Sequence, residues 1–564
     1  MTTVGLTGEK AAIAAVEAAV SDTAAEAVRV DPEAIGRADI AVLAASVGSS
    51  TPKRASELAR ETGTPVITIE LGGIGGQPVD GVEAAVSGAA PGTACYSCLR
   101  QRVEAGDPET DDGTHESPSA RFAGAVAGRE LTDLLAGEES AVLGGVIELP
   151  YTRRQVLPVP YCACADGDRG TLRRDERPRS IDESISLAEA AFDERVGPIE
   201  SVGEVESFPV PYYLATLADT PFSDADAPDH AAGVGIDWDP AFMKALGEAL
   251  ERYSAAVYRT DDFTTEPEAP VDPTRFVRPD ANADPTVKTW FGAEHLETDR
   301  AVQLPASTVV FPPLDGTIRP AITTGLGLGN GGSEAIRSGL YEVIERDAAM
   351  LSWYSTYEPM ELIVDDEAFG TLAARAESEG LSATVLLLTQ DIDVPVVAAC
   401  VHRESEWPRF AAGSSADLDP KAAARGALEE AIQNWLELRR MGAERAAEAG
   451  GAIGTHADFP AETRAFVDAE TTVPAATVGP SEPPSGEAEL AALLDRIAAS
   501  ELDAYAARLT PRDVEAIGFE GVRVVVPEAQ PLFTGEPYFG ERAETVPGAL
   551  GFEPRLERTY HPFP

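Results

Sequence analysis

Apolar and polar positions in the first hundred residues alternate with two different periods. Short apolar runs predict strands at residues 4–8 (VGLTG), 38–47 (ADIAVLAASV) and 64–73 (TPVITIELGG). Between them, residues 10–20 (KAAIAAVEAAV) and 52–62 (PKRASELARET) carry a helical period. Alternating strands and helices are typical of βαβ units, so this region predicts a small parallel sheet with covering helices.

Glycines follow these expected strands at residues 5–8, 48 and 72–76. None of them spells GxGxxG or GxxxxGK[ST], the spacings that hold a dinucleotide or a triphosphate. We therefore interpret them as tight turns at strand ends rather than as a nucleotide site.

Polar segments divide the rest of the chain. Loops are predicted at 104–119, 165–190 and 218–231, and a long solvated insertion at 446–488. The main boundary is placed near residue 195, between the helix-like SLAEAAFDER and the strand-like VGPIESVGEVESF. The sequence thus predicts two domains, residues 1–195 and 196–564, in a mixed α/β fold.

The charge of the chain is strongly negative. It has 95 acidic and 44 basic side chains among 564 residues, a net charge of −51, and only five of the basic residues are lysines. Such a field repels phosphate backbones, which argues against nucleic-acid binding. It fits a halophilic protein in a cytosol of molar salt, where the Debye length is about 3 Å; an acidic mesophilic protein is the alternative. No apolar run is long enough to span a membrane, and no secretory signal is recognised, so a cytoplasmic protein is expected.

Four cysteines form two close pairs. Cys95 and Cys98 make a CxxC, and Cys162 and Cys164 make a CxC. Two thiolate pairs separated by a loop supply a tetrahedral S₄ shell, which suits a structural zinc ion. The alternatives are a redox dithiol, which leaves the CxC unexplained, and small buried side chains. Cys400 lies in the apolar run VPVVAAC and is expected in the core.

Three segments beyond residue 230 predict helices that carry carboxylates. The first, residues 239–258, has Glu248 and Glu251 three apart with Arg252 beside them. The second follows a glycine-rich turn, residues 325–332, whose backbone amides are expected to face an anion at a helix N-terminus. Ser333 is the expected N-cap of that helix.

The second and third helices repeat the pattern at helical spacing. Glu334, Glu342 and Glu345 share one face of the second helix, whereas Arg425, Glu429 and Gln433 share one face of the third. Singly, each set is typical of a solvated face. If the three helices converge, the combined sets predict a site for Mg²⁺, which prefers a few carboxylates plus phosphates. Arg346 and Arg425 would then bind phosphate oxygens through two hydrogen bonds each.

The segments ALGEALERYSA, TTGLGLGNGGSEAIRSGLYEVIERDA and RGALEEAIQ resemble the three ATP-binding motifs of the YcaO proteins. CYSCLRQR and VLPVPYCAC resemble the zinc-binding cysteines of the partner domain in azoline-forming cyclodehydratases, a reduced relative of ubiquitin-activating enzymes. The paired arrangement resembles the cyclodehydratases of thiazole/oxazole-modified microcin (bacteriocin) biosynthesis, of a haloarchaeal type.

The resemblance implies the ligands of ATP, Mg²⁺ and Zn²⁺. Zn²⁺ would be held by the four paired cysteines. Contacts to Mg²⁺ or nucleotide are implied for Glu248, Glu251, Glu334, Glu342, Glu345, Glu429 and Gln433, of which Glu248, Glu251, Glu342, Glu345 and Glu429 would hold the metal. Contacts to the nucleotide or its phosphates are implied for Thr323, Asn330, Arg346 and Arg425. The chain departs from the family pattern at Lys244, where Ser is usual, and in its tail, which has one proline fewer than the fullest pattern.

In this family a Cys, Ser or Thr side chain of a ribosomally made precursor peptide attacks the preceding carbonyl, and ATP phosphorylates the resulting oxygen so that an azoline forms. The resemblance suggests the C-terminal carboxylate of Pro564 as the base, with His561 as the alternative and Arg425 as a catalytic residue. Backbone thioamidation and a non-catalytic peptide-binding scaffold are alternative functions. A separate leader-binding protein, a dehydrogenase and a homodimer are left open as partners.

Overall fold

The computed structural model describes residues 2–150, 152–164, 170–281, 285–314 and 317–563. Residues up to 195 contain β1 (Thr3–Gly8), α1 (Lys10–Ser21), β2 (Glu26–Arg29), β3 (Ile40–Ser46), α2 (Thr51–Thr62), β4 (Val66–Leu71), β5 (Ala84–Ala89), α3 (Tyr96–Ala105), α4 (Ser117–Ala136), β6 (Gly145–Leu149), β7 (Thr152–Gln155) and α5 (Ile181–Ala188). The strands and helices expected in the first 73 residues are therefore confirmed. Edge strand β2, whose four side chains are all exposed, was not predicted, because it has no apolar alternation.

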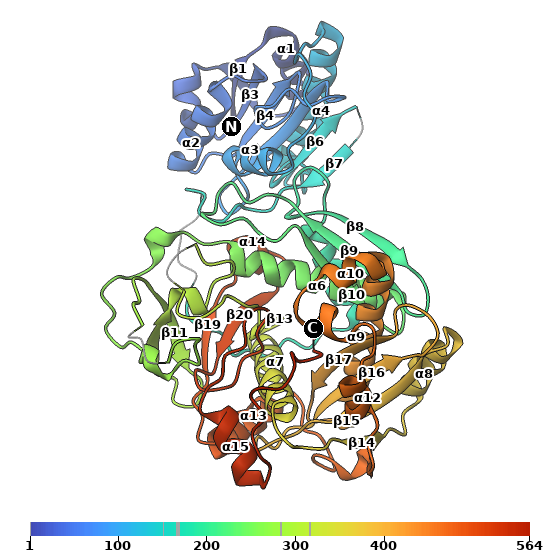
Figure 1. The fold of residues 1–564 in the computed structure, drawn as a ribbon. Coiled ribbons are helices and arrows are strands. Elements are labelled where there is room, and N and C mark those ends of the chain that lie inside the picture. The colour runs from blue at the N-terminus through green and yellow to red at the C-terminus, as the bar shows by residue number, and fades with distance from the viewer. Residues whose placement is uncertain (1, 151, 165–169, 282–284, 315–316, 564) are drawn as a thin grey trace.

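The first seven strands form one sheet in the order β2-β1-β3-β4-β5-β6-β7. β2, β1, β3 and β4 run parallel, whereas β5, β6 and β7 are antiparallel to their neighbours. Helices α1 and α4 cover one face of this sheet, and α2 covers part of the other. In Figure 1 this unit is the blue to cyan part at the top of the molecule.

The remaining strands are β8 (Ile199–Glu206), β9 (Tyr212–Leu217), β10 (His230–Val234), β11 (Trp290–His295), β12 (Ala301–Pro305), β13 (Leu326–Gly329), β14 (Met360–Ile363), β15 (Ser382–Leu387), β16 (Val396–His402), β17 (Phe410–Ala416), β18 (Thr472–Pro474), β19 (Tyr505–Arg508) and β20 (Glu520–Val525). The helices are α6 (Trp238–Ala256), α7 (Gly332–Trp353), α8 (Glu367–Ser378), α9 (Pro420–Met441), α10 (Ala443–Glu448), α11 (Gly451–His456), α12 (Ala461–Val467), α13 (Glu487–Ala499), α14 (Arg512–Ala516) and α15 (Arg542–Leu550).

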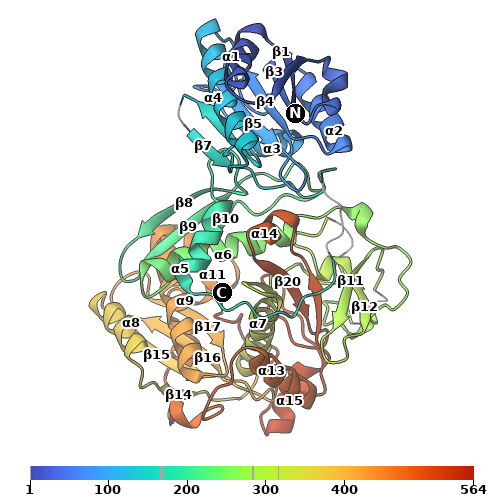
Figure 2. The ribbon, with the colours of Figure 1, turned by 180° about the vertical axis from the view of Figure 1, so that it is seen from behind.

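These strands make three sheets, in the orders β10-β9-β8, β12-β11-β19-β20-β13 and β17-β16-β15-β14-β18. Strand β16 shows how the helices are placed. Val396, Ala398 and Cys400 pack in the core that contains α7, whereas Val397 and Ala399 on the opposite face pack against α9. The sheet therefore separates α7 from α9, and Cys400 is a core residue as predicted. Figure 2 shows the same arrangement from behind.

The segment 446–488 corrects one prediction, because it is not a solvated insertion. It contains α11, α12 and β18, and β18 pairs in parallel with β14. Phe459, Phe466 and Val467 are buried in the main core. Isolated apolar residues between short helices carry no period over a window of a dozen residues, which is why the pattern was missed.

The segment 165–190 is also more ordered than predicted, although residues 165–169 lie outside the described residues. Ser180 and Glu183 form a capping box that starts α5. Within the described residues, no helix has the length and apolar character needed to cross a membrane. The domain boundary near residue 195 and the high-salt interpretation of the composition stay predictions.

Candidate functional site

Helices α6, α7 and α9 bring together one buried carboxylate, that of Glu345, and several half-buried ones. Ser414, on β17, joins two of them, because its Oγ donates to Glu345 Oε1 at 2.7 Å and its backbone N–H donates to Glu430 Oε2 at 2.6 Å. Arg346 lies between the same two glutamates, with Nε 3.5 Å from Glu345 and Nη2 3.8 Å from Glu430. Glu342 and Glu251 lie near enough for their charges to affect each other. We call Glu248, Glu251, Glu342, Glu345 and Glu430 the carboxylate cluster.

Burial leaves part of this negative charge uncompensated. Desolvation, and then the charge of Glu342, raises the pKa of Glu251 to about 8. Desolvation likewise raises the pKa of Glu430 to about 7, against the lowering effect of Arg346. The raised pKa values mean that neighbouring cations do not balance the negative charge of these carboxylates. Carboxylate oxygens that lack a balancing cation suit a hard divalent metal ion. No three of them converge as closely as the cysteines described below, within the residues the structure describes. That spacing fits an ion held by one or two carboxylates plus phosphates.

Arg523, on β20, is a buried guanidinium beside the cluster. It is 3% exposed, and its Nη atoms donate to the carbonyl oxygens of Ile322 and Thr323, both at 2.8 Å. Its Nε has no hydrogen-bond partner among the described atoms. Burial, and then the neighbouring charge of Arg319, lowers the pKa of Arg523 to about 9. A buried cation of this kind fits an anionic ligand, and sequence reasoning missed it because a single Arg in an apolar strand carries no motif.

Asn330 connects the turn before α7 to α5. Its backbone N–H and Nδ2 donate to Glu334 Oε2 at 2.8 and 3.1 Å. Its Oδ1 accepts from Ser184 Oγ at 3.0 Å and from Arg179 Nη1 at 3.3 Å. Ser184 and Arg179 were not predicted. Their capping-box context predicts the local helix, but nothing in the sequence indicates that this helix reaches Asn330.

The glycine turn corrects a second expectation. Its amides do not face an open anion seat, because the Gly332 N–H donates to Asp175 Oδ1 at 3.4 Å and the Ser333 N–H donates to the Asp175 carbonyl at 3.2 Å. Gly331 is the N-cap of α7, whereas Ser333 lies inside the helix and is fully buried. The main chain fits closely here, since a Cβ on Gly332 would lie 1.9 Å from the Arg173 carbonyl oxygen.

Helix α9 presents a different residue to the cluster from those expected. Glu430 is turned by about 100° from Glu429 on the helix, and it is Glu430 that contacts Arg346 and Ser414. Glu429 forms an ion pair with Lys244. Gln433 donates to Glu437 at 3.0 Å, and Arg425 pairs with Asp366 at 2.7 Å. The predicted common face of α9 thus exists, but its side chains contact Lys244, Asp366 and Glu437, which are not members of the cluster.

The remaining predicted residues lie as follows. Glu342 Oε2 accepts the Gly325 N–H at 2.9 Å, and Glu248 accepts from Arg252 at 2.9 Å. Thr323 contributes its carbonyl oxygen to Arg523. Pro564 lies outside the described residues. His561 is buried, and its Nε2 lies 2.9 Å from the Phe533 carbonyl oxygen. Burial lowers the pKa of His561 to about 4.

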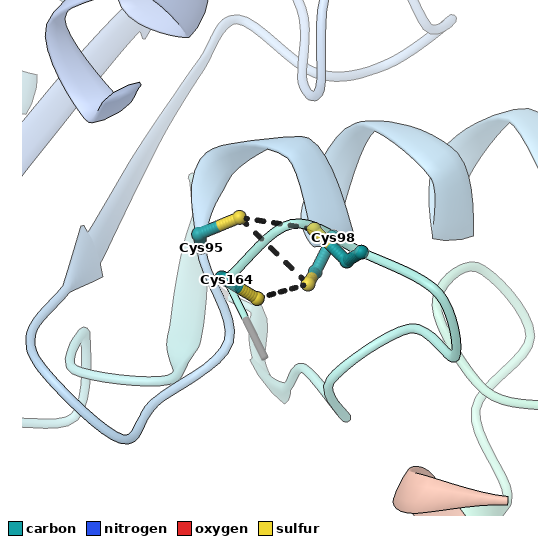
Figure 3. Close-up of side chains that lie close together, drawn as sticks. Cys95, Cys98 and Cys164 are labelled. Carbon is teal, nitrogen blue, oxygen red and sulfur yellow. Dashed lines mark hydrogen bonds between the residues drawn. The ribbon is translucent and has the colours of Figure 1, made fainter. Parts of the chain in front are cut away.

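The four paired cysteines meet where α3 begins. Cys95 is the N-cap of α3, and its Sγ lies 3.8 Å from Cys98 Sγ and 3.5 Å from Cys162 Sγ. Cys98 Sγ lies 3.4 Å from Cys164 Sγ, and all four sulfurs lie within 4.8 Å of one another. Figure 3 shows the sulfurs of Cys95, Cys98 and Cys164 turned toward one another. Hydrogen bonding, chiefly with Cys162, lowers the pKa of Cys95 to about 7. Four thiol groups at this spacing fit a tetrahedral metal.

A buried charge pair lies next to the cysteines. Arg102 on α3 pairs with Asp513 on α14, and Asp513 also accepts a hydrogen bond from Tyr253 on α6. Arg512, the first residue of α14, donates to Cys164 Sγ at 3.3 Å. The metal-site region is therefore in direct contact with the helix that carries Glu248 and Glu251.

The chain thus has a mixed α/β fold with a carboxylate cluster, buried arginines and a four-cysteine site. These features agree with the family that the sequence matches. Residues 232–530, more than half of the chain, match the model of the YcaO cyclodehydratase family, described as ATP- and Mg²⁺-binding, and the chain belongs to this family.

The chain is also similar to two known structures and to one sequence relative. A heterocyclase in complex with substrate and cofactor is similar over 98% of this chain and 83% of its own, with a TM-score of 0.74 and 18% identity. YcaO from Methanopyrus kandleri, bound with AMPPCP and Mg²⁺, is similar over 62% of this chain and 88% of its own, with a TM-score of 0.50 and 24% identity. An uncharacterized protein of Methanothermobacter thermautotrophicus is 31% identical over 250 residues, which cover 42% of this chain and 64% of that protein, less than two thirds of its length.

Proposed function

We propose that the chain is an ATP- and Mg²⁺-dependent cyclodehydratase that installs azoline rings at Cys, Ser or Thr of a ribosomally made precursor peptide. Two features carry the proposal: carboxylates of α7 and α9 gather around Arg346, and Glu251 of α6 lies near Glu342 and the buried Arg523. Carboxylates alone repel a triphosphate, whereas the same carboxylates with Mg²⁺ and two buried guanidinium groups attract it. The likeness of the whole chain to a heterocyclase supports the azoline reaction over other amide chemistry.

The residues have separable tasks in this proposal. The carboxylate cluster would hold Mg²⁺, with one or two of its carboxylates on each ion and phosphate oxygens as further ligands, and Arg346 and Arg523 would bind phosphate oxygens. Asn330, fixed by Glu334, Ser184 and Arg179, would orient the nucleotide at the start of α7. ATP supplies a phosphoryl group that turns a poor leaving oxygen of the peptide backbone into a good one. The chain contributes positioning and charge neutralisation, which are the main needs of phosphoryl transfer.

The tail and the cysteine site complete the proposal. The role of Pro564 as the base stays a prediction, whereas His561 is buried and its Nε2–H donates to the Phe533 carbonyl oxygen. The four cysteines would hold a structural Zn²⁺ that fixes α3 against the loop after β7. The unit of residues 1–195 would organise the catalytic half and help bind the peptide. Roles of Arg425, Glu429 and Gln433 at the nucleotide stay predictions.

Binding of AMPPCP with Mg²⁺, measured by titration calorimetry, tests the nucleotide site. Glu342→Gln and Arg523→Met are each expected to weaken binding by roughly 10- to 100-fold, because a hydrogen bond to a charged group contributes about 1.5–3 kcal/mol. Glu367→Gln, an exposed glutamate in the first turn of α8, is the matched control. Equal affinities in all four proteins would show that the nucleotide does not bind at the cluster.

Mass spectrometry of a precursor peptide co-expressed with the chain identifies the reaction. Loss of one water per modified residue is expected for azoline formation. A gain corresponding to sulfur in place of oxygen would instead mean thioamidation. An unmodified peptide, together with no peptide-stimulated ATP hydrolysis, would favour the scaffold.

A further inference from the structure

An ion pair joins α6 to α9 at the edge of the carboxylate cluster. The Lys244 ammonium bonds Glu429 Oε2, and the other carboxylate oxygen of Glu429 accepts the Ile236 N–H at 3.1 Å. The Lys244 side chain is 50% exposed and that of Glu429 is 12% exposed. Both oxygens of Glu429 are therefore engaged, one by a cation and one by the backbone.

Each partner of this pair lies close in sequence to a member of the carboxylate cluster, since Glu429 directly precedes Glu430 on α9. Glu248 lies one helical turn beyond Lys244 on α6, so the two side chains share a face. Glu248 has Arg252 and the Ala232 N–H as its partners. Glu429 would extend the cluster by one more carboxylate if the Lys244 ammonium were not on it.

The cation paired with Glu429 is an ammonium group and not a guanidinium group. Only five residues of the whole chain are Lys, against 39 Arg, so Lys is the exception here. An ammonium is a compact, hydrated point charge on a flexible stem, and in this respect it resembles a small metal ion more than a planar guanidinium does. Unlike Mg²⁺, it needs no octahedral ligand set and loses little of its hydration at a half-exposed position.

We propose that the Lys244 ammonium takes the place of a divalent cation at Glu429, so that the chain binds its nucleotide with one divalent cation fewer than its glutamates allow. The inference rests on the proposed function, because the carboxylate cluster must be a metal–nucleotide site. Lys244 is then a positioning residue that sets how many metal ions the site holds.

Counting bound Mn²⁺ by the loss of its free electron paramagnetic resonance signal, in the presence of saturating AMPPCP, tests the inference. Lys244→Ser is expected to bind one more Mn²⁺ per chain than the unaltered protein, because the Glu429 carboxylate loses the ammonium group that is paired with it. Lys244→Arg, which keeps the charge, and Lys421→Ser, in the first turn of α9, are expected to bind the unaltered number. The double variant Lys244→Ser/Glu429→Gln is expected to return to that number, because the freed carboxylate is gone.

Equal Mn²⁺ counts for Lys244→Ser and the unaltered protein would overturn the inference, as would an extra ion that persists in the double variant. Calorimetry with AMPPCP separates this result from failure of the proposed function. If the unaltered protein binds AMPPCP with Mn²⁺ but the counts are equal, only the role of Lys244 is wrong. If it binds neither, the metal–nucleotide site is wrong and the inference falls with it.

Discussion

Replacing Arg102 with Leu removes the cation from a charge pair that is almost completely closed to water. Arg102 is 1% exposed and Asp513 is fully buried. The substitution leaves the Asp513 carboxylate in the interior with the Tyr253 hydroxyl as its remaining side-chain donor. Removing one partner of a buried pair typically costs about 3–5 kcal/mol, because the other charge stays desolvated. We expect a loss of this size in the free energy of unfolding.

Urea unfolding followed by tryptophan fluorescence measures the loss, together with Asp513→Leu and the double variant. The double variant is expected to lose less than the sum of the single losses, because no unpaired charge remains buried in it. Arg129→Leu is the matched control, since Arg129 is 73% exposed, lies 3.9 Å from Asp133, and makes a pair worth about 0–1 kcal/mol. A cost under about 1 kcal/mol for Arg102→Leu, or strictly additive losses, would refute the reasoning.

Three further predictions concern the rest of the chain. Elemental analysis is expected to find zinc in the unaltered protein and in the core variant Cys400→Ser but not in Cys162→Ser; equal zinc contents in the three proteins would contradict the site. Burial raises the pKa of Glu70 to about 7, so the folded state binds a proton that the unfolded state releases near pH 4.5. The stability that this group contributes is therefore full below about pH 4.5 and is lost as the pH rises through 7. Glu70→Gln is expected to raise the melting temperature at pH 8 but not at pH 4. An equal shift at both pH values would contradict the raised pKa of Glu70. Phe563→Ala is expected to cost about 3–5 kcal/mol in urea unfolding, because the side chain is buried in the main core, whereas a cost near zero would mean that the tail is not docked.

The strands and helices of the first 73 residues were predictable because each is one uninterrupted period. The helices that carry the carboxylates were predictable for the same reason. The choice between Glu429 and Glu430 was not predictable, since adjacent glutamates differ by about 100° around the helix and contacts with Ser414 and Arg346, distant in sequence, decide which one joins the carboxylate cluster. Arg523 and Ser184 were missed because their importance comes from tertiary contacts and not from a local pattern.

The contact of Asp175 with the first turn of α7 bears on where the catalytic half can be cut. The family match begins at residue 232, yet Asp175, Arg179 and Ser184 complete the start of α7 and hold Asn330. A fragment trimmed to the matched residues would leave backbone donors of that helix open to solvent and its asparagine unsupported. The smallest piece that preserves this helix end therefore has to include the connecting segment from about residue 170 onward.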